Sequence, residues 1–196
     1  MRPSRELLWT SKPVESEQPN GFRIQLLDQG YQSVQPINFW GKADGTFENT
    51  TLFSGKYKVL PIEGAFVQPD TQTVDIAGST KVDFSVVPYL RISIPVVEKA
   101  ANKVSVQYSL SRSVVTTKIA ERKLLVSSSP TVNNTTNNRS IVTDLSQIAD
   151  DKLLNVTFTD VLTDLQPGTY YVRVAARTSN ALNRYNYLST IQISIP

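Results

Sequence analysis

The sequence of 196 residues contains no cysteine and no histidine. Without cysteine, the chain can form neither a disulfide nor a thiolate metal site. Without histidine, it lacks the imidazole on which most catalytic triads and most general acid–base schemes depend. These absences leave few routes to catalysis, and we therefore expect a protein that is not an enzyme and that carries no metal or cofactor.

Long apolar runs and a strong net charge are also missing. No apolar run approaches the length of a membrane-spanning helix, and the basic start is followed only by Leu7-Leu8-Trp9, too short for a signal peptide. The formal net charge is +3, with charged residues making up 19% of the chain. A charge this small does not indicate nucleic-acid binding. We expect no nucleic-acid partner, and a monomer.

The chain does show alternation of apolar and polar residues. This period of two predicts strands in both halves of the sequence, at residues 22–26, 73–76, 81–86, 104–110, 119–126, 154–158 and 191–195. The charges of the 119–126 segment indicate an outer or edge strand. The polar run 127–140 is predicted to be a loop that buries no core.

Pro88 separates two series of predicted strands. A fresh alternation begins after it, which predicts a boundary between Val86 and Ser93. We expect an irregular N-terminal segment at 1–14, a first domain at 15–89 and a second domain at 90–196. No convincing helix is found, although residues 144–151 could form one helical turn.

Two stretches resemble known β-sandwich modules. In the first half, Asp44-Gly45 forms a turn and the order D-G-x-F then L-x-x-G-x-Y-x-V, ending at Val59, resembles transthyretin-like modules. In the second half, 165–177 resembles the corner and following strand of fibronectin type III domains. There a corner tyrosine bonds back to the backbone, and the spacing leaves open whether Tyr170 or Tyr171 takes that role.

The predicted fold is therefore all-β, with two tandem β-sandwich domains. The first is expected to be transthyretin (prealbumin)-like and the second fibronectin type III-like or immunoglobulin-like. In the strand at 170–177, Tyr170, Val172, Val174 and Ala176 are predicted to face inward, and Tyr171, Arg173 and Arg177 outward.

Several short motifs together resemble one family, the Bacteroidetes lipoproteins named domain of unknown function 3823. They are E-Q-P-N-G-F-R-I at 17–24, F-W-G-K at 39–42, the D-G-x-F turn, and G-A-F at 64–66. The resemblance implies a lipid-anchored, extracytoplasmic protein on the periplasmic or outer face of the outer membrane. It also implies an accessory role beside SusC/SusD-like importers in polysaccharide uptake. The family has no assigned catalytic residues.

The start of the chain departs from that family pattern. Members carry a lipobox cysteine and a first strand ahead of the region matching Lys12-Pro13-Val14, whereas this chain has no cysteine. Either the start is artificial or an anchor was removed. Membrane attachment is therefore expected only through an N-terminal lipid anchor that is absent from this chain.

The aromatic residues Tyr31, Phe39 and Trp40 are the candidate ligand-binding residues. They fall in the segment 29–42, predicted to be largely loop, and flat aromatic rings stack on the apolar faces of sugars. The alternative is that Phe39 and Trp40 plug the base of the sandwich, because Trp is highly buried on average. Tyr185 and Tyr187 could form a second platform or pack in the core.

The acidic residues give no clear site. Asp160 and Asp164 bracket Val161-Leu162 and could hold calcium weakly, but no oxygen-rich loop surrounds them, which favours a solvated loop. Two readings of function remain. One is a non-enzymatic accessory lipoprotein that binds glycan or a partner protein, and the other is a purely structural spacer or adhesin-like stalk with no ligand.

Overall fold

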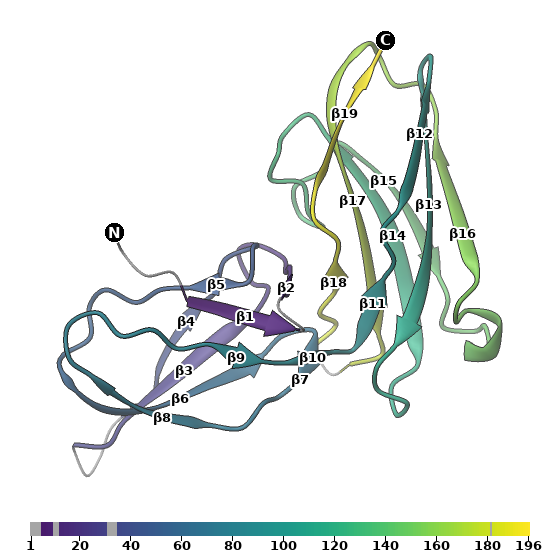
Figure 1. The fold of residues 1–196 in the computed structure, drawn as a ribbon. Helices are drawn as coiled ribbons and strands as arrows, with labels where there is room; N and C mark the ends of the chain where they lie inside the picture. Colours follow the sequence, from purple (N-terminus) through teal and green to yellow (C-terminus); the bar gives the residue numbers. More distant parts are fainter. Residues whose placement is uncertain (1–4, 10–11, 31–34, 181) are drawn as a thin grey trace. The chain divides into compact units, whose positions relative to one another are not determined.

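The computed structural model describes residues 5–9, 12–30, 35–180 and 182–196, and it divides into two compact units, Met1–Pro88 and Tyr89–Pro196 (Figure 1). Across these described residues, every regular element is a strand except one 3-10 turn, η1 (Asp150–Lys152). The all-β fold predicted from the sequence is confirmed. None of the described segments is a helix long and apolar enough to span a membrane.

The N-terminal unit is built around an antiparallel sheet with the strand order β4-β3-β6-β8. Its strands are β3 (Arg23–Asp28), β4 (Ile37–Trp40), β6 (Gly55–Glu63) and β8 (Gln72–Ile76). In a second sheet, the central strand β1 pairs with three short strands. These strands are β1 (Arg5–Trp9), β2 (Lys12–Pro13), β5 (Thr46–Phe47) and β9 (Phe84–Ser85). A separate pair joins β7 (Phe66–Val67) to β10 (Val87–Pro88).

Two sequence expectations need correction in this unit. Segment 1–14 was expected to be irregular, yet it contains β1 and β2, and β1 pairs with β5 and β9, which lie far along the chain. The single strand expected over 81–86 is reduced to β9, and the next strand, β10, begins only beyond that segment, at Val87. The alternation within it is still real, because its apolar side chains are buried: Val82, Phe84 and Val86.

The core of the N-terminal unit follows the period of two along its strands. Ile24 and Leu26 of β3 are buried beside Tyr57 and Val59 of β6, while the residues between them face outward. The other sheet contributes buried aromatic rings, Phe47 and Phe84, to the same cluster. The other face of the β4-β3-β6-β8 sheet carries the alternate residues, which include the polar side chains of Arg23 and Gln25 as well as Leu27 and Leu60.

The C-terminal unit consists of two antiparallel sheets. In the first, β13 pairs with three strands; the members are β11 (Leu90–Ile92), β12 (Val96–Ala100), β13 (Lys103–Arg112) and β16 (Thr157–Leu162). The second has the order β15-β14-β17-β18, with β19 also paired to β17. Its members are β14 (Ile119–Ser127), β15 (Arg139–Asp144), β17 (Gly168–Thr178), β18 (Asn186–Tyr187) and β19 (Ile191–Ile195).

The core of the C-terminal unit lies between these two sheets, as in a β-sandwich. It is formed by alternate residues of the facing strands, as predicted: Val104, Val106, Tyr108, Leu110, Leu124, Val126, Val172, Val174, Ala176, Ile193 and Ile195. The prediction of an outer or edge strand at 119–126 is wrong, because β14 lies between β15 and β17. The charged side chains of β14 form ion pairs, described below. These ion pairs allow a central strand to contain charged residues.

Candidate functional site

Strand β4 turns its two aromatic residues to opposite sides. Phe39 is half-buried and packs on the core, with its ring centroid 6.4 Å from that of Phe47. Trp40 is 37% exposed. The two rings therefore do not form a joint, solvent-facing pair. They also lie on a strand rather than on the loop expected from the sequence, and the third candidate, Tyr31, lies outside the described residues.

Arg23 lies directly beside Trp40 on the outward face of the sheet. The two residues are partners in the β3–β4 register, and the guanidinium carbon is 5.7 Å from the centroid of the Trp40 ring. A cation at this distance is attracted to the face of the ring. The same guanidinium donates to Glu63 on β6, with Nη1 3.0 Å from Oε1. Three neighbouring strands thus each place one side chain in the row Trp40–Arg23–Glu63.

A β-bulge sets the position of Glu63. Arg23 pairs with Glu63 and Ile24 pairs with Pro61, so that Ile62 is an extra residue on β6. In a regular ladder without a bulge, Ile62 would stand opposite Arg23 and Glu63 would lie one position beyond it. Bulges re-aim side chains and are frequent beside functional sites. This bulge brings a carboxylate next to the arginine that contacts Trp40.

Two amides form the next row on the same face. Gln25 pairs with Asn38 in the register, and its Nε2 donates to Asn38 Oδ1 at 3.3 Å. The row lies two residues along the strands from Trp40, a distance of about 7 Å. We call the surface formed by these five side chains the Trp40 face: Trp40, Arg23, Glu63, Gln25 and Asn38.

The Trp40 face combines a flat ring with groups that both donate and accept hydrogen bonds. The guanidinium supplies N–H donors, the carboxylate accepts, and the amides do both. Because the one cation is paired with the one anion, the face as a whole carries no net charge. An exposed aromatic ring bordered by such groups can hold a polar ligand that also has an apolar side.

Of the two alternatives for Tyr185 and Tyr187, the structure supports packing in the interior over a second platform. The two side chains are only 9% and 7% exposed, and they pack in a small cluster on the outer side of β14 and β17. Val132 of the polar 127–140 loop is buried in that cluster, so the expectation that this loop buries no core is also wrong. Arg173 faces away from the core between the sheets, as predicted, but it is covered by this cluster and donates to the carbonyl oxygens of Leu188 and Val132.

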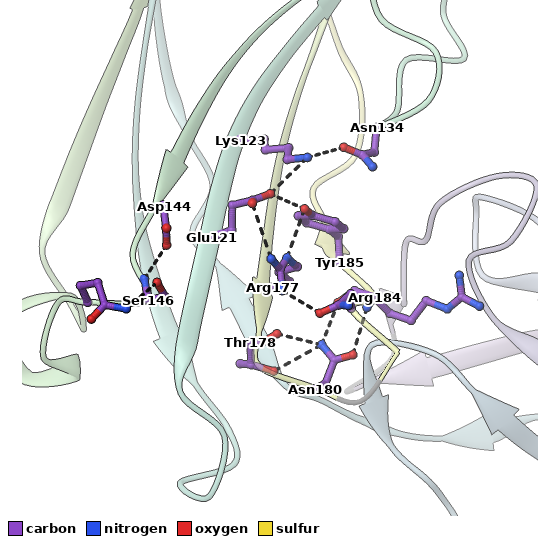
Figure 2. A network of polar contacts seen from close by, with 12 residues as sticks. Glu121, Lys123, Asn134, Asp144, Ser146, Arg177, Thr178, Asn180, Arg184 and Tyr185 are labelled. Carbon is purple, nitrogen blue, oxygen red and sulfur yellow. Dashed lines mark hydrogen bonds and ion pairs between the residues drawn. The ribbon is translucent and has the colours of Figure 1, made fainter.

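Charged side chains lie around Tyr185 of this tyrosine cluster (Figure 2). Tyr185 donates its hydroxyl proton to Glu121, which also lies 3.1 Å from Lys123 Nζ and 3.5 Å from Arg177 Nη2. Burial raises the pKa of Glu121, but the hydrogen bonds from Tyr185 and Lys123 and the nearby cations outweigh it, and the net pKa is lowered. Burial raises the pKa of Tyr185. This arrangement stabilises the sheet and leaves little ring surface for a ligand.

The turn that leads into Tyr185 is held by the side chains of Asn180 and Arg177. Asn180 Nδ2 donates to the carbonyl oxygens of Thr178 and Arg184, at 3.1 and 3.0 Å, and its Oδ1 accepts from the Arg184 N–H at 3.0 Å (Figure 2). Arg177 donates to Asn183 within the same turn, at 2.9 Å. These bonds help to position Tyr185 over β14.

Asp160 does not lie in a solvated loop as expected. It is buried on β16 and accepts hydrogen bonds from Tyr108, at 2.7 Å, and from Arg122. Burial, together with Asp160, raises the pKa of Tyr108. The Arg122 guanidinium lies 4.7 Å from the centroid of the Phe158 ring. Among the described residues, no group of three or more acidic side chains could hold a metal ion.

Sequence reasoning identified Trp40 but missed Arg23 and Glu63. The outward position of Arg23 was available from the alternation of residues 22–26. The contribution of Glu63 was not, because it depends on a bulge that has no sequence signature here. Pairing register, rather than residue type, assembles the Trp40 face.

Known proteins share this fold. Residues 5–87 match the model of a family described as protein of unknown function (DUF3823), N-terminal domain. No curated protein matches the sequence.

Solved structures align along nearly the whole chain. A DUF3823 family protein from Bacteroides uniformis has a TM-score of 0.83 at 22% identity, covering 98% of each chain. One from Parabacteroides merdae has a TM-score of 0.83 at 20% identity, covering 99% of this chain and 100% of that chain. Another Bacteroides uniformis structure, described as a candidate carbohydrate binding protein, has a TM-score of 0.79 at 22% identity over 97% of each chain. The family resemblance seen in the sequence is thereby confirmed: residues 5–87 match the N-terminal domain of DUF3823, a family of unknown function, and the whole chain shares the fold of DUF3823 family proteins.

Proposed function

We propose that the protein binds carbohydrate without catalysis and that the Trp40 face is the binding surface. The observation that carries the proposal is the outward, 37% exposed ring of Trp40 beside the Arg23–Glu63 pair on an open sheet face. A pyranose ring has an apolar face that stacks on an indole and a rim of hydroxyls that bond to neighbouring polar groups. The description of one Bacteroides uniformis relative as a candidate carbohydrate binding protein supports the same reading.

The composition of the Trp40 face suits binding rather than turnover. Glycoside hydrolysis uses two carboxyl groups that flank the scissile bond. The Trp40 face contains one carboxylate, Glu63, and that group is engaged with Arg23. A single stacking platform contributes about 0.5–1.5 kcal/mol beyond burial, so we expect weak affinity for short oligosaccharides. Polysaccharides gain from repeated engagement by neighbouring copies of the protein.

We further propose an accessory role in polysaccharide uptake. In this role the protein is extracytoplasmic, anchored to the outer membrane by an N-terminal lipid, and presents glycan beside SusC/SusD-like importer components. The support is the family resemblance of the sequence. Membrane fractionation of cells that express the full-length gene product, with and without globomycin, tests the location. A product that stays in the cytoplasmic fraction contradicts this role.

The binding proposal is tested with Trp40→Ala on a polysaccharide panel, by affinity gel electrophoresis and calorimetry. We expect wild-type protein to bind at least one polysaccharide and Trp40→Ala to lose that binding while remaining folded. Phe53→Ala is the matched control, because it removes another large aromatic side chain, 86% exposed, from the same unit outside the Trp40 face. Wild-type protein that binds no polysaccharide would support a structural spacer instead. Binding that Trp40→Ala leaves unchanged would show that the binding site lies outside the Trp40 face.

A further inference from the structure

We infer that Glu63 is a specificity-determining residue and that the Trp40 face takes uncharged glycans and excludes those with carboxylate or sulfate groups. This inference rests on the proposed function and adds the class of ligand. Its basis is the ion pair beside Trp40, in which Arg23 Nη1 and Glu63 Oε1 are 3.0 Å apart.

The first step concerns charge. A lone arginine beside an exposed tryptophan would attract an acidic sugar, because guanidinium pairs strongly with carboxylate and sulfate. Here the charge of Arg23 is already matched by Glu63. An anionic group that approaches Arg23 must either displace the Glu63 carboxylate or sit beside it, and two carboxylates at one site repel. The pair therefore acts against anionic ligands.

The second step concerns whether Glu63 can be displaced. Its side chain is only 18% exposed, compared with 34% for Arg23. The bulge at Ile62 fixes the backbone so that Glu63 stands opposite Arg23. Moving the carboxylate away would leave a partly buried charge without its cation, which is costly. Glu63 therefore stays in place when a ligand arrives.

The third step concerns what the pair can recognise. A guanidinium has five N–H donors, and within the described part of the chain Arg23 donates one hydrogen bond, from Nη1 to Glu63. A hydroxyl group both donates and accepts, so neighbouring hydroxyls on one sugar ring can meet a donor on Arg23 and an acceptor on Glu63 together. The amides of Gln25 and Asn38 add uncharged donors and acceptors farther along the strands. The ligand class that fits is a neutral polysaccharide.

The test compares wild-type protein and Glu63→Gln on two sets of probes. One set contains the neutral polysaccharides galactomannan, xyloglucan and starch; the other contains polygalacturonate and chondroitin sulfate. We expect wild-type protein to bind at least one neutral probe and to bind the anionic probes at least roughly tenfold more weakly, a difference of about 1.4 kcal/mol. Glu63→Gln frees the charge of Arg23 and should strengthen anionic binding by roughly tenfold, in a manner that added salt weakens.

Asp83→Asn is the matched control. It removes the negative charge from another ion pair of the same unit, Lys81–Asp83, whose N–O distance is 3.1 Å. It changes the net charge as Glu63→Gln does and should leave both sets of affinities unchanged. Thermal unfolding of both variants checks that they are folded. The preference of wild-type protein for neutral over anionic probes is measured without any variant.

The outcomes separate the two ideas. Wild-type protein that binds neither set refutes the proposed function and this inference with it. Wild-type protein that binds both sets equally well refutes this inference and leaves carbohydrate binding standing. A folded Glu63→Gln variant with no gain toward the anionic probes also overturns it, as does an equal gain in Asp83→Asn.

Discussion

The phenol of Tyr170 donates a hydrogen bond to the carbonyl oxygen of Gln166, four residues earlier, at 3.0 Å. This bond answers the question that the sequence left open, because it makes Tyr170 rather than Tyr171 the corner tyrosine of the C-terminal unit. The N-terminal unit repeats the relationship: Tyr57 donates to the carbonyl oxygen of Phe53, also four residues earlier, at 3.1 Å. Each unit thus secures the entry to a long strand with a tyrosine.

Removing either corner hydroxyl should destabilise the protein. We expect Tyr170→Phe and Tyr57→Phe each to lower the free energy of unfolding by about 1 kcal/mol, the usual contribution of one hydrogen bond. Denaturant unfolding measures the change. Tyr171→Phe is the control, since the structure describes no hydrogen bond from the Tyr171 hydroxyl and the residue follows Tyr170 on the same strand. An equal loss in Tyr171→Phe would contradict a special role for the corner.

Stability should depend on pH through Glu121. Its pKa is lowered in the folded state from its ordinary value of 4.5. A group whose folded pKa lies below the unfolded value contributes stability that is present above the unfolded pKa and is lost as the pH falls through the folded pKa. The stability advantage of wild type over Glu121→Gln should therefore shrink below about pH 4.5. Denaturant unfolding from about pH 7 to about pH 3 measures it.

The control for this pH dependence is Glu98→Gln, which removes an exposed carboxyl on β12. Its stability should follow that of wild type over the same pH range. A difference between Glu121→Gln and wild type that stays constant with pH would show that Glu121 acts through packing and not through its charge.

Breaking the buried pair of Arg122 and Asp160 should be far more damaging than breaking an exposed one. Asp160→Ala leaves the Arg122 guanidinium, whose side chain is 12% exposed, without its carboxylate. We expect a loss of about 3 kcal/mol or more, since an uncompensated buried charge costs that much. Asp83→Asn, at an exposed pair, should cost less than about 1 kcal/mol. Equal losses by denaturant unfolding would contradict this ranking.

Much of this fold could be predicted from alternation alone. The strand at 191–195 was predicted with its bounds, and the inward-facing residues of β13 and β17 follow the period of two. Pairing was harder to predict. The sequence gives no sign that the charged strand β14 is central, because its polar and charged partners come from β16, from β17 and from Tyr185, just before β18.

In the candidate site, too, some features follow from the local sequence and others depend on long-range strand pairing. Trp40 could be chosen from its residue type, but its outward direction depends on strand β4, which the sequence reading took for mostly loop. Glu63 reaches Arg23 only because of the bulge in β6. Sequence reasoning thus identified Trp40 but missed the Arg23–Glu63 ion pair that lies beside it.

The last prediction separates a binding ring from a core ring within one strand. Phe39 packs on Phe47 inside the cluster, so Phe39→Ala should lower the free energy of unfolding by about 2–3 kcal/mol, toward the low end for a phenylalanine because the ring is only half-buried. Trp40→Ala loses the contact with Arg23 and partial burial, and we expect about 1 kcal/mol. Polysaccharide binding should follow the opposite order. It should be lost in Trp40→Ala and kept in Phe39→Ala at temperatures where that variant is folded, as judged by circular dichroism. If Trp40→Ala is the more destabilising of the two, Trp40 serves the core and the Trp40 face is not a binding surface.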